Sequence, residues 1–353
     1  MQIDSEWIKN ESLQNILQII KKADHNAYLV GGCVRNSILN FPVNDIDIST
    51  DAKPEETLDL FNIESFKATP TGFSHGTVTV VSKDIPYQIT TMRSDQNTDG
   101  RHADVSFSDN ITKDAERRDF TINALYADAT GKIIDPIGGL KDFQPLRIKF
   151  IGNANNRIKE DYLRILRFFR FHAQFADLVV DFERDALDAI KDNQNGLKFL
   201  SKERVWNELQ KILLSKNPSR ALSEMSKIGV LEKVLSDGGI KSIKNLISIE
   251  QKMGIEPEAI RRLVAITRNT EITSLNLSRK EVKKFSVLKS LLEKNFDPAE
   301  LVYQFNKEVA QSVLAISTFN QGEKLKLSDV KKIEKACLYP CPISGAHLSK
   351  YMS

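Results

Sequence analysis

The feature of this 353-residue chain that most restricts its fold is a change of hydrophobic pattern near Phe150. Before that residue, short runs rich in β-branched and aromatic residues alternate with helical segments, and Gly, Pro, Asn or Asp bound the runs. After it, apolar residues recur at helical spacing, and Gly and Pro become less frequent. Because the chain is also longer than one hydrophobic core usually serves, we expect an α+β head followed by an all-helical arm.

The first part contains several runs with the pattern of strands or helices. Strands are expected at Ala27–Val30, Asp45–Ile48, Gly76–Ser82, Tyr87–Met92 and Asp104–Phe107. Helices are expected at Asn10–Lys22, Arg35–Leu39 and Lys53–Phe61. In the second part, Ile158, Tyr162, Ile165 and Phe169 recur on one helical face, which predicts a continuous helix through residues 157–171.

Charge and targeting signals limit the possible partners of the chain. The net charge is only +3, from 50 basic and 47 acidic residues, so a nucleic-acid partner requires positive charge that is concentrated locally. The N-terminal segment MQIDSEWIKNES lacks the pattern of a signal peptide, and no apolar run reaches the length of a membrane span. We therefore expect a cytoplasmic protein without membrane association, and nothing in the sequence indicates an obligate protein partner.

Residues 29–50 read LVGGCVRNSILNFPVNDIDIST and begin with a β-run that leads into two glycines. Paired glycines let the backbone come close to a phosphate, which makes Gly32 a candidate nucleotide contact. Arg35 follows on a helix-compatible stretch, where its guanidinium could bind the same triphosphate in a bidentate manner. The segment therefore predicts a phosphate-binding turn.

Asp45 and Asp47 lie two residues apart in the strand-like run at the end of this segment. Alternation along a strand places both carboxylates on one face, where they repel each other unless a cation lies between them. Mg²⁺ prefers such oxygen ligands and bridges to substrate phosphates. A lone Asp-x-Asp pair more often marks a turn at a strand end, but the glycines and Arg35 upstream favour a metal site.

This segment resembles the signature of the polymerase-β-like nucleotidyltransferases, in the class II branch that contains tRNA CCA-adding enzymes and bacterial poly(A) polymerases. The resemblance implies a mixed-sheet catalytic head at residues 1–145, a helical neck with a base-selecting helix at 146–215, and a helical body and tail at 216–353 that bind tRNA. It also implies that Asp45 and Asp47 are catalytic metal ligands for Mg²⁺, and that CTP and ATP are the nucleotides.

A second polar block follows at residues 87–143 and contains an arginine pair beside an aspartate. By itself, this block predicts a helix start with Asp119 as the N-cap. It also resembles the family's ribose-and-phosphate motif, which implies that Arg118, Asp119 and Asn123 contact the nucleotide. Residues 99–102 resemble the family's flexible loop, and residues 135–139 resemble its hinge.

One position departs from the family pattern. The family often carries a third carboxylate on the strand before its Thr-Thr-x-Arg sequence, and Gln88 occupies that position here. An amide carries no charge with which to hold a metal or accept a proton. The sequence therefore leaves the base that deprotonates the RNA 3′ hydroxyl unassigned.

Residues 160–164 match the family's Glu-Asp-x-x-Arg motif completely. The resemblance implies that Asp161 and Arg164 hydrogen-bond the incoming base in place of a template, with Arg167 and Arg170 extending the row. A carboxylate accepts from the amino group of cytosine or adenine, and a guanidinium donates to the ring nitrogen or carbonyl. Without the resemblance, these residues would be interpreted as a surface ion pair.

The leading hypothesis is addition of CCA to the tRNA 3′ end, with release of pyrophosphate at each step. Poly(A) polymerases and enzymes that add only CC or only A share these motifs. Residues 71–77 stand where bacterial poly(A) polymerases typically carry a Gly-Arg-[Arg/Lys]-Phe-Arg run, which favours tRNA maturation. A catalytically silent RNA-binding protein is the alternative from another class, and Gln88 is the observation that favours it.

Overall fold

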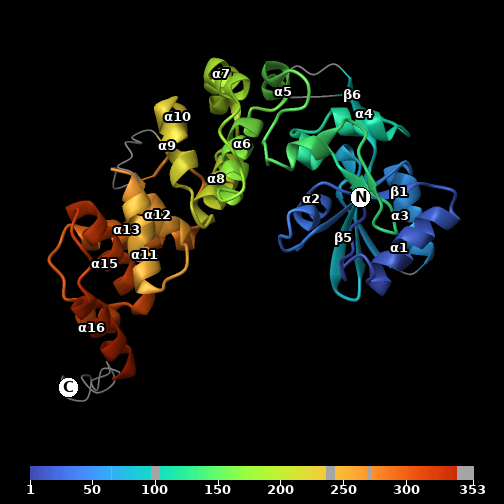
Figure 1. Ribbon diagram of the computed structural model, residues 1–353. Helices are drawn as coiled ribbons and strands as arrows, with labels where there is room; N and C mark the ends of the chain where they lie inside the picture. The colour runs from blue at the N-terminus through green and yellow to red at the C-terminus, as the bar shows by residue number, and fades with distance from the viewer. Residues whose placement is uncertain (65, 97–103, 236–242, 269–271, 340–353) are drawn as a thin grey trace. The chain divides into compact units, whose positions relative to one another are not determined.

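The computed structural model describes residues 1–64, 66–96, 104–235, 243–268 and 272–339 (Figure 1). Within these residues the chain forms two compact units. The head unit comprises Met1–Arg164 and Asp177–Asn193, and the helical unit comprises Ile165–Ala176 and Gln194–Ser353. Each unit has its own buried apolar core, as expected for a chain of this length.

The head unit contains a seven-stranded mixed sheet and a separate two-stranded sheet. The seven strands, in their spatial order, are β3 (Lys67–Gly72), β4 (Thr77–Ser82), β5 (Ile85–Thr91), β2 (Ile46–Thr50), β1 (Ala27–Val30), β8 (Tyr126–Ala127) and β9 (Ile133–Ile134). The two-stranded sheet pairs β6 (Arg93–Gln96) with β7 (Asp104–Phe107). Strand β2 is antiparallel to β1 and parallel to β5, and the other neighbours in the large sheet are antiparallel.

Short helices accompany this sheet. They are α1 (Glu11–Lys22), α2 (Gly32–Ile38), α3 (Pro54–Ile63), α4 (Ile111–Glu116), α5 (Ala154–Glu160) and α7 (Arg184–Asn193), with 3₁₀ turns η1 (Phe73–His75), η2 (Thr121–Asn123) and η3 (Gly139–Asp142). Side-chain capping explains where α1 begins, because the Asn10 side chain accepts hydrogen bonds from the backbone amides of Ser12 and Leu13.

The helical unit consists of helices and one 3₁₀ turn in its described residues. They are α6 (Leu163–Gln174), whose first two residues belong to the head unit, η4 (Gln194–Phe199), α8 (Lys202–Leu214), α9 (Ser219–Lys227), α10 (Val230–Val234), α11 (Lys244–Met253), α12 (Ala259–Ile266), α13 (Arg279–Leu292), α14 (Pro298–Gln304), α15 (Lys307–Gln321) and α16 (Leu327–Leu338). None of the helices in the described residues has the length and apolar character that a membrane crossing requires.

The fold class expected from the sequence is confirmed: a mixed-sheet head is followed by helices. The expected strands Ala27–Val30 and Asp104–Phe107 match β1 and β7, and the other strands and helices expected before Phe150 differ from the observed elements only at their ends. Strands β3, β6, β8 and β9 were not expected. The segments 99–102 and 342–345, which resemble the flexible loop and a tail motif, lie outside the described residues.

The expectation of one continuous helix through residues 157–171 is wrong. Helix α5 ends at Glu160 and α6 begins at Leu163. Asp161 has an extended backbone, with φ −153° and ψ 106°, and its carboxylate accepts the amide hydrogen of Leu163 at 3.1 Å. This side chain therefore competes with the helix for a backbone donor, as Asp often does at helix starts. Asp161 and Arg164 lie at a helix junction, not on one face of one helix.

The expected helix start at Asp119 is also wrong. The helix in this block, α4, precedes the arginine pair, and only the 3₁₀ turn η2 follows Asp119. The Asp119 carboxylate accepts from the backbone amide of Phe120 at 2.8 Å and from the side-chain amide of Asn123 at 2.9 Å. Both donors lie close to Asp119 in sequence, so its carboxylate stabilises a tight turn.

A buried ionic cluster joins three helices of the helical unit. Glu250 in α11 binds Arg261 Nε at 2.7 Å through one oxygen and Arg262 Nη2 at 2.7 Å through the other. Arg262 also donates to the carbonyl oxygens of Leu213 and Ser215, at the end of α8. Because the three charged side chains are almost fully buried, each charge depends on its partner.

We predict that Glu250→Ala lowers the stability of the helical unit by about 3–5 kcal/mol, because it leaves two guanidinium groups buried without a counter-charge. Urea unfolding followed by Trp206 fluorescence in a Trp7→Phe background would report on this unit, since the two tryptophans lie in different units. Lys326→Ala, which removes an exposed ion pair with Glu323, is the control and should have a far smaller effect. Equal losses in the two variants would contradict the prediction.

Candidate active site

The two aspartates lie where the centre of the large sheet meets the glycine turn. Asp45 is exposed and immediately precedes β2, and Asp47 is half-buried within that strand. Ile48, which follows Asp47, is fully buried, but burial along β2 does not alternate as the sequence predicted, because Ile46 is half-buried like Asp47, and Ser49 and Thr50 are buried with Ile48. Asp47 lies opposite Val30 of β1, one residue before Gly31. This pairing brings the carboxylate to the start of the glycine turn.

Four charged side chains interact at this position. Burial raises the pKa of Asp47 above its usual value, and the negative charge of Asp45 raises it further. The positive charges of Arg118 and Arg35 act in the opposite direction and lower this pKa. The net result is a carboxylate that is costly to keep charged in the absence of a cation. Asp45, Arg35 and Arg118 are therefore close enough to Asp47 to act on it electrostatically.

The glycine turn has a backbone that only glycine adopts readily. Gly31 has φ 72° and ψ −119°, and it is the N-cap residue of α2. A Cβ at Gly31 would lie 3.5 Å from Nη1 of Arg118 and 3.8 Å from the carbonyl oxygen of Asn123. Gly32, the residue expected to bind the nucleotide, has ordinary space around it, since a Cβ there would lie 3.8 Å from Nη2 of Arg35. Gly31 is therefore the more restricted of the two glycines.

Arg35 belongs to a chain of buried polar contacts. Its Nη1 donates to the side-chain oxygen of Asn123 at 2.5 Å, and its Nε and Nη2 donate to Asn36 Oδ1 at 3.1 and 2.8 Å. Asn123 in turn donates to Asp119. The structure thus brings together three of the residues expected to contact the nucleotide. Their hydrogen bonds fix the orientation of the Arg35 guanidinium.

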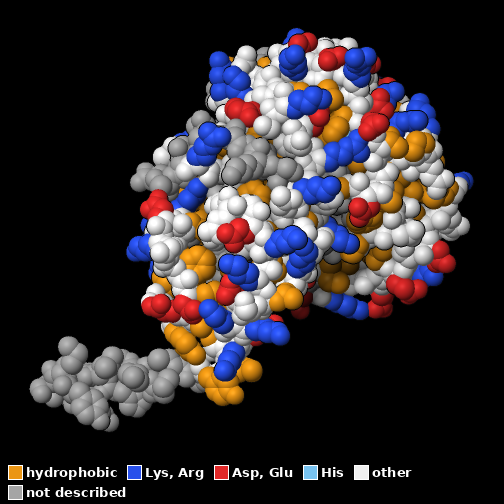
Figure 2. All heavy atoms as spheres, turned by 60° about the vertical axis from the view of Figure 1, so that its left-hand side comes forward, with side chains coloured by type: hydrophobic (Ala, Val, Ile, Leu, Met, Phe, Trp, Pro, Cys, Tyr) orange, Lys and Arg blue, Asp and Glu red, His pale blue; other side chains and the backbone are white. Residues whose placement is uncertain are grey.

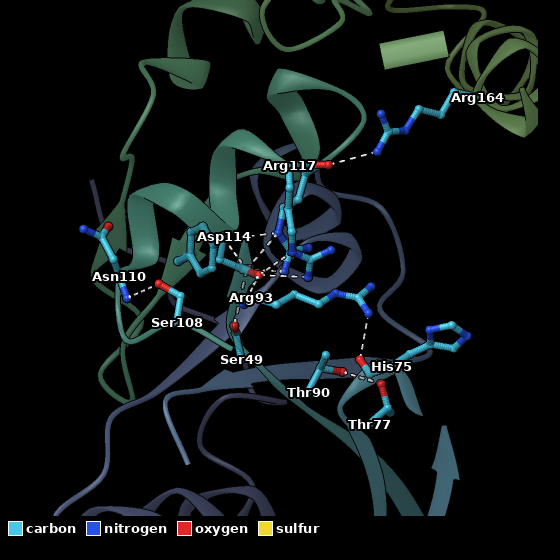
Figure 3. A network of polar contacts seen from close by, with 12 residues as sticks. Ser49, His75, Thr77, Thr90, Arg93, Ser108, Asn110, Asp114, Arg117 and Arg164 are labelled. Atoms are coloured by element: carbon cyan, nitrogen blue, oxygen red, sulfur yellow. Dashed lines mark hydrogen bonds and ion pairs between the residues drawn. The ribbon is translucent and has the colours of Figure 1, made fainter. Parts of the chain in front are cut away.

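Arg118 is held by a carboxylate that was not singled out from the sequence. Asp114 in α4 is fully buried and forms ion pairs with Arg117 at 2.8 Å and with Arg118 at 2.9 Å. Figure 3 shows Asp114 at the centre of this network, with contacts from β2 and from the start of β6. The signal for this pairing was present in the sequence, because an acid three and four residues before two arginines can pair with both on a helix.

The core that packs against this network consists of two alanines, two β-branched residues and one tyrosine. Val30 of β1, Ala115 of α4, Tyr126 of β8, Ala124 and Ile151 form one buried cluster. Through this cluster, α4 is fixed against the strands that carry the glycine turn. The buried carboxylate of α4 is thereby kept at a constant position relative to the turn.

Gln88 lies directly beside Asp47 on the neighbouring strand. Strands β2 and β5 are parallel, and Asp47 is paired in register with Gln88. Register partners point to the same face of a sheet, so the exposed Gln88 side chain occupies the third position of the site. Among the described residues, no group of three or more His, Cys, Asp or Glu side chains could hold a metal ion. The carboxylate donors at this site therefore remain the two aspartates.

Arg164, one of the residues expected to select the base, is oriented by contacts within the head unit. Its Nη2 donates to the carbonyl oxygen of Arg117 at 2.9 Å, as Figure 3 shows. Its Nη1 donates to Glu160 at 2.5 Å and to the carbonyl oxygen of Arg157 at 2.8 Å. Glu160, the first residue of the Glu-Asp-x-x-Arg motif, thus holds the last one. No role for Glu160 was expected from the sequence.

Arg167 and Arg170, which were expected to extend this row, belong to the helical unit. The guanidinium of Arg170 lies 4.4 Å from the centre of the Phe171 ring and forms an ion pair with Glu208 at 3.2 Å. Arg167 lies over the same ring at 5.7 Å. These contacts give both arginines packing partners within α6 and α8.

Oxygen donors, an anionic pair and nearby guanidinium groups fit a site for a hard cation and a phosphorylated ligand. Burial raises the pKa of Asp47, and Asp45 raises it further. A bound cation would lower this pKa, because it stabilises the charged carboxylate. Carboxylate oxygens are the ligands that Mg²⁺ prefers. Arg35 and Arg118 supply positive charge close to the same carboxylate, as a triphosphate requires.

Comparisons with known proteins show the family to which the chain belongs. Residues 27–149 match the family model described as the poly A polymerase head domain. Residues 180–238 match the model described as a probable RNA and SrmB-binding site of polymerase A. Among solved structures, that of the Bacillus stearothermophilus CCA-adding enzyme in complex with CTP is similar, with a TM-score of 0.73 and 26% identity, over 97% of this chain and 87% of that one.

Curated relatives resemble the chain over most of its length. The CCA-adding enzyme of Limosilactobacillus reuteri is 35% identical over 350 residues, which cover 96% of this chain and 81% of the relative. The mitochondrial CCA tRNA nucleotidyltransferase 1 of Mus musculus is 30% identical over 357 residues, with the same two coverages of 96% and 81%. The resemblance seen in the sequence is thus confirmed, and the chain belongs to the family of CCA-adding tRNA nucleotidyltransferases.

Proposed function

We propose that this protein adds C, C and A in turn to the 3′ end of tRNA, from CTP and ATP and without a nucleic-acid template, releasing pyrophosphate at each step. The observation that carries this proposal is the position of Asp47 opposite the start of the glycine turn, under the influence of Asp45, Arg118 and Arg35. The family to which the chain belongs supplies the reaction.

Nucleotidyltransferases of this family depend on a metal ion, and we propose that Asp45 and Asp47 hold Mg²⁺ here. The bound metal would neutralise charge on the phosphates and lower the pKa of the attacking hydroxyl. Arg118 and Arg35 bind the triphosphate, and the glycine turn lets it approach the backbone. Asp119, which is hydrogen-bonded to Asn123, places polar groups for the ribose.

Gln88 occupies the third position of the site without the charge of a carboxylate. Its amide is a poor proton acceptor, so Gln88 does not act as the base that activates the RNA 3′ hydroxyl. A metal held by Asp45 and Asp47 would supply the activation of that hydroxyl.

Base selection is assigned to Asp161 and Arg164 at the junction of α5 and α6. At this junction, the Arg164 guanidinium donates hydrogen bonds to Glu160 and to two backbone carbonyl groups. A preorganised guanidinium discriminates between bases because it does not rearrange to accept a wrong hydrogen-bonding pattern. Arg167 remains a candidate for the same role. Arg170 has a buried partner in Glu208, which favours a structural role for it.

The helical unit, together with the neck residues, is proposed to bind tRNA. On the face shown in Figure 2, Lys and Arg side chains are distributed over the surface with Asp and Glu among them. This face does not show the local concentration of positive charge that a nucleic-acid partner was expected to require. The support for tRNA binding is therefore the family of the chain, and folded RNA is recognised mainly by shape and backbone. We propose the division of the chain into a catalytic head at 1–145, a neck at 146–215, and a body and tail at 216–353 on the same basis.

Incubation of tRNA that lacks its CCA end with each nucleotide, alone and in mixtures, tests the proposed function. We expect two C residues from CTP alone, one further A when ATP is added, and no addition of UTP or GTP. The products are resolved by denaturing gel electrophoresis. Long A-tails would identify a poly(A) polymerase, and addition restricted to CC or to A would identify a partial enzyme. Loss of all incorporation would favour the silent RNA-binding protein.

Gly31→Ala is expected to weaken nucleotide binding. The new methyl group would lie against Arg118, and the positive φ would cost on the order of 1–3 kcal/mol of strain. We therefore expect a rise in the KM for CTP together with a lower Tm. Gly152→Ala is the matched control, because Gly152 has φ +65° but nothing within 4 Å of its Cβ position. An equal rise in KM in both variants would show that strain, not the nucleotide cradle, causes the effect.

A further inference from the structure

Asp114 is a buried carboxylate for which the proposed reaction has no direct use. Its Oδ2 accepts from the Tyr126 hydroxyl at 2.6 Å and from Arg118 Nη2 at 2.9 Å, with Ser49 Oγ at 3.4 Å. Its Oδ1 accepts from Arg117 Nε at 2.9 Å and from the backbone amide of Arg93 at 3.4 Å. Both oxygens are therefore occupied, and one carboxylate orients two guanidinium groups.

The contacts of Asp114 use only one edge of the Arg118 guanidinium. Nε and Nη2 face Asp114, at 3.3 and 2.9 Å. Nη1 lies on the other side, 3.5 Å from the position that a Cβ of Gly31 would occupy. Because the guanidinium is planar and rigid, anchoring one edge fixes the direction of the other. The remaining donor is thus presented to the glycine turn.

A second carboxylate competes for Arg118. Asp47 pairs with Val30, the residue before Gly31, and Arg118 Nη1 lies 3.5 Å from the Cβ position of Gly31, so these two side chains of opposite charge lie at the same turn. In the described part of the chain, however, Arg118 forms its ion pair with Asp114, and Asp47 forms none within 4.0 Å. If Asp114 lost its charge, Asp47 would be the carboxylate that draws Arg118. That new pair would occupy oxygens that a metal requires.

We propose that Asp114 is a positioning residue that holds Arg118 beside the glycine turn and away from Asp47, so that Asp47 stays open to the metal. The inference rests on the proposed function for the identity of the ligands. The buried network itself is independent of that function, since it is fixed by the packing of α4 on β1 and β8.

Asp114 is also linked, through Arg117, to the junction of α5 and α6 that is proposed to select the base. Asp114 holds the side chain of Arg117, and the carbonyl oxygen of Arg117 accepts from Arg164 Nη2 at 2.9 Å (Figure 3). Loss of the Asp114 charge therefore loosens a backbone group that orients Arg164. Reduced discrimination between CTP and UTP is the expected consequence.

Asp114→Asn tests the proposal because it removes the charge with almost no change of shape. We expect the Kd for Mn²⁺, titrated into the CTP-bound protein without tRNA, and the Mg²⁺ concentration for half-maximal CTP addition both to rise by about 10- to 100-fold, the range typical of residues around a metal site. The KM for CTP should rise as well. A simple charge effect on the KM for CTP would have the opposite sign, because removing a negative charge strengthens attraction for a triphosphate. A simple charge effect on the Mg²⁺ requirement would have the same sign, so a variant that restores the net charge is also needed.

Two further variants separate positioning from general destabilisation. Tyr126→Phe removes a hydroxyl that donates to the same Asp114 oxygen and accepts from Arg118 Nε at 3.1 Å, but it leaves the ion pair between Asp114 and Arg118, so it should lower the Tm and raise the Mg²⁺ requirement far less than Asp114→Asn does. The double variant Asp114→Asn with Arg117→Gln restores the net charge of the cluster and should fold if Asp114→Asn alone does not. It should still show the raised Mg²⁺ requirement.

The possible results separate this inference from the proposed function. An unchanged or lower Mg²⁺ requirement in folded Asp114→Asn or in the double variant would overturn the inference, as would an equal rise in Tyr126→Phe. Failure of the unaltered protein to incorporate CTP would instead contradict the proposed function. A raised Mg²⁺ requirement with poorer discrimination against UTP supports both the positioning of Arg118 and the link to Arg164.

Discussion

The arrangement of charged groups in the head depends on one partly buried carboxylate, that of Asp47. A carboxylate at this depth is unfavourable when charged unless cations surround it, and burial accordingly raises its pKa. The sheet supplies the depth, because β2 lies between β1 and β5. The chain supplies two guanidinium groups nearby, and a metal with its nucleotide would complete the neutralisation.

The two arginines that act on Asp47 are each held by other groups. Arg35 is fixed through Asn123 and Asn36, and Arg118 through Asp114. Positive charge is thus oriented before a ligand arrives, which avoids the cost of arranging it during the reaction. The same logic extends to Arg164, which Glu160 and the carbonyl oxygen of Arg117 hold at the helix junction. Hydrogen bonds to neighbouring side chains and backbone groups therefore direct each of these cations.

The sequence predicted the parts of the structure that depend on local pattern. A short β-branched run bounded by polar residues identified the strand that carries Asp47, and the change of period near Phe150 separated the mixed-sheet region from the helices. Residues whose roles come from long-range packing were missed, such as Tyr126, which lies twelve positions from Asp114 but donates to it. The break at Asp161 was missed because its cause is a single side-chain hydrogen bond to Leu163, which leaves the apolar spacing unchanged.

We propose that Asp45 and Asp47 point the same way and share a cation next to a nucleotide. Anomalous diffraction from crystals grown with Mn²⁺ and CTP tests it most directly, because Mn²⁺ accepts the oxygen ligands of Mg²⁺ and can be located by its own signal. We predict a Mn²⁺ peak that is coordinated by an oxygen from each aspartate and by phosphate oxygens of CTP. Carboxylates that face apart, or a nucleotide bound with its metal elsewhere, would contradict the claim.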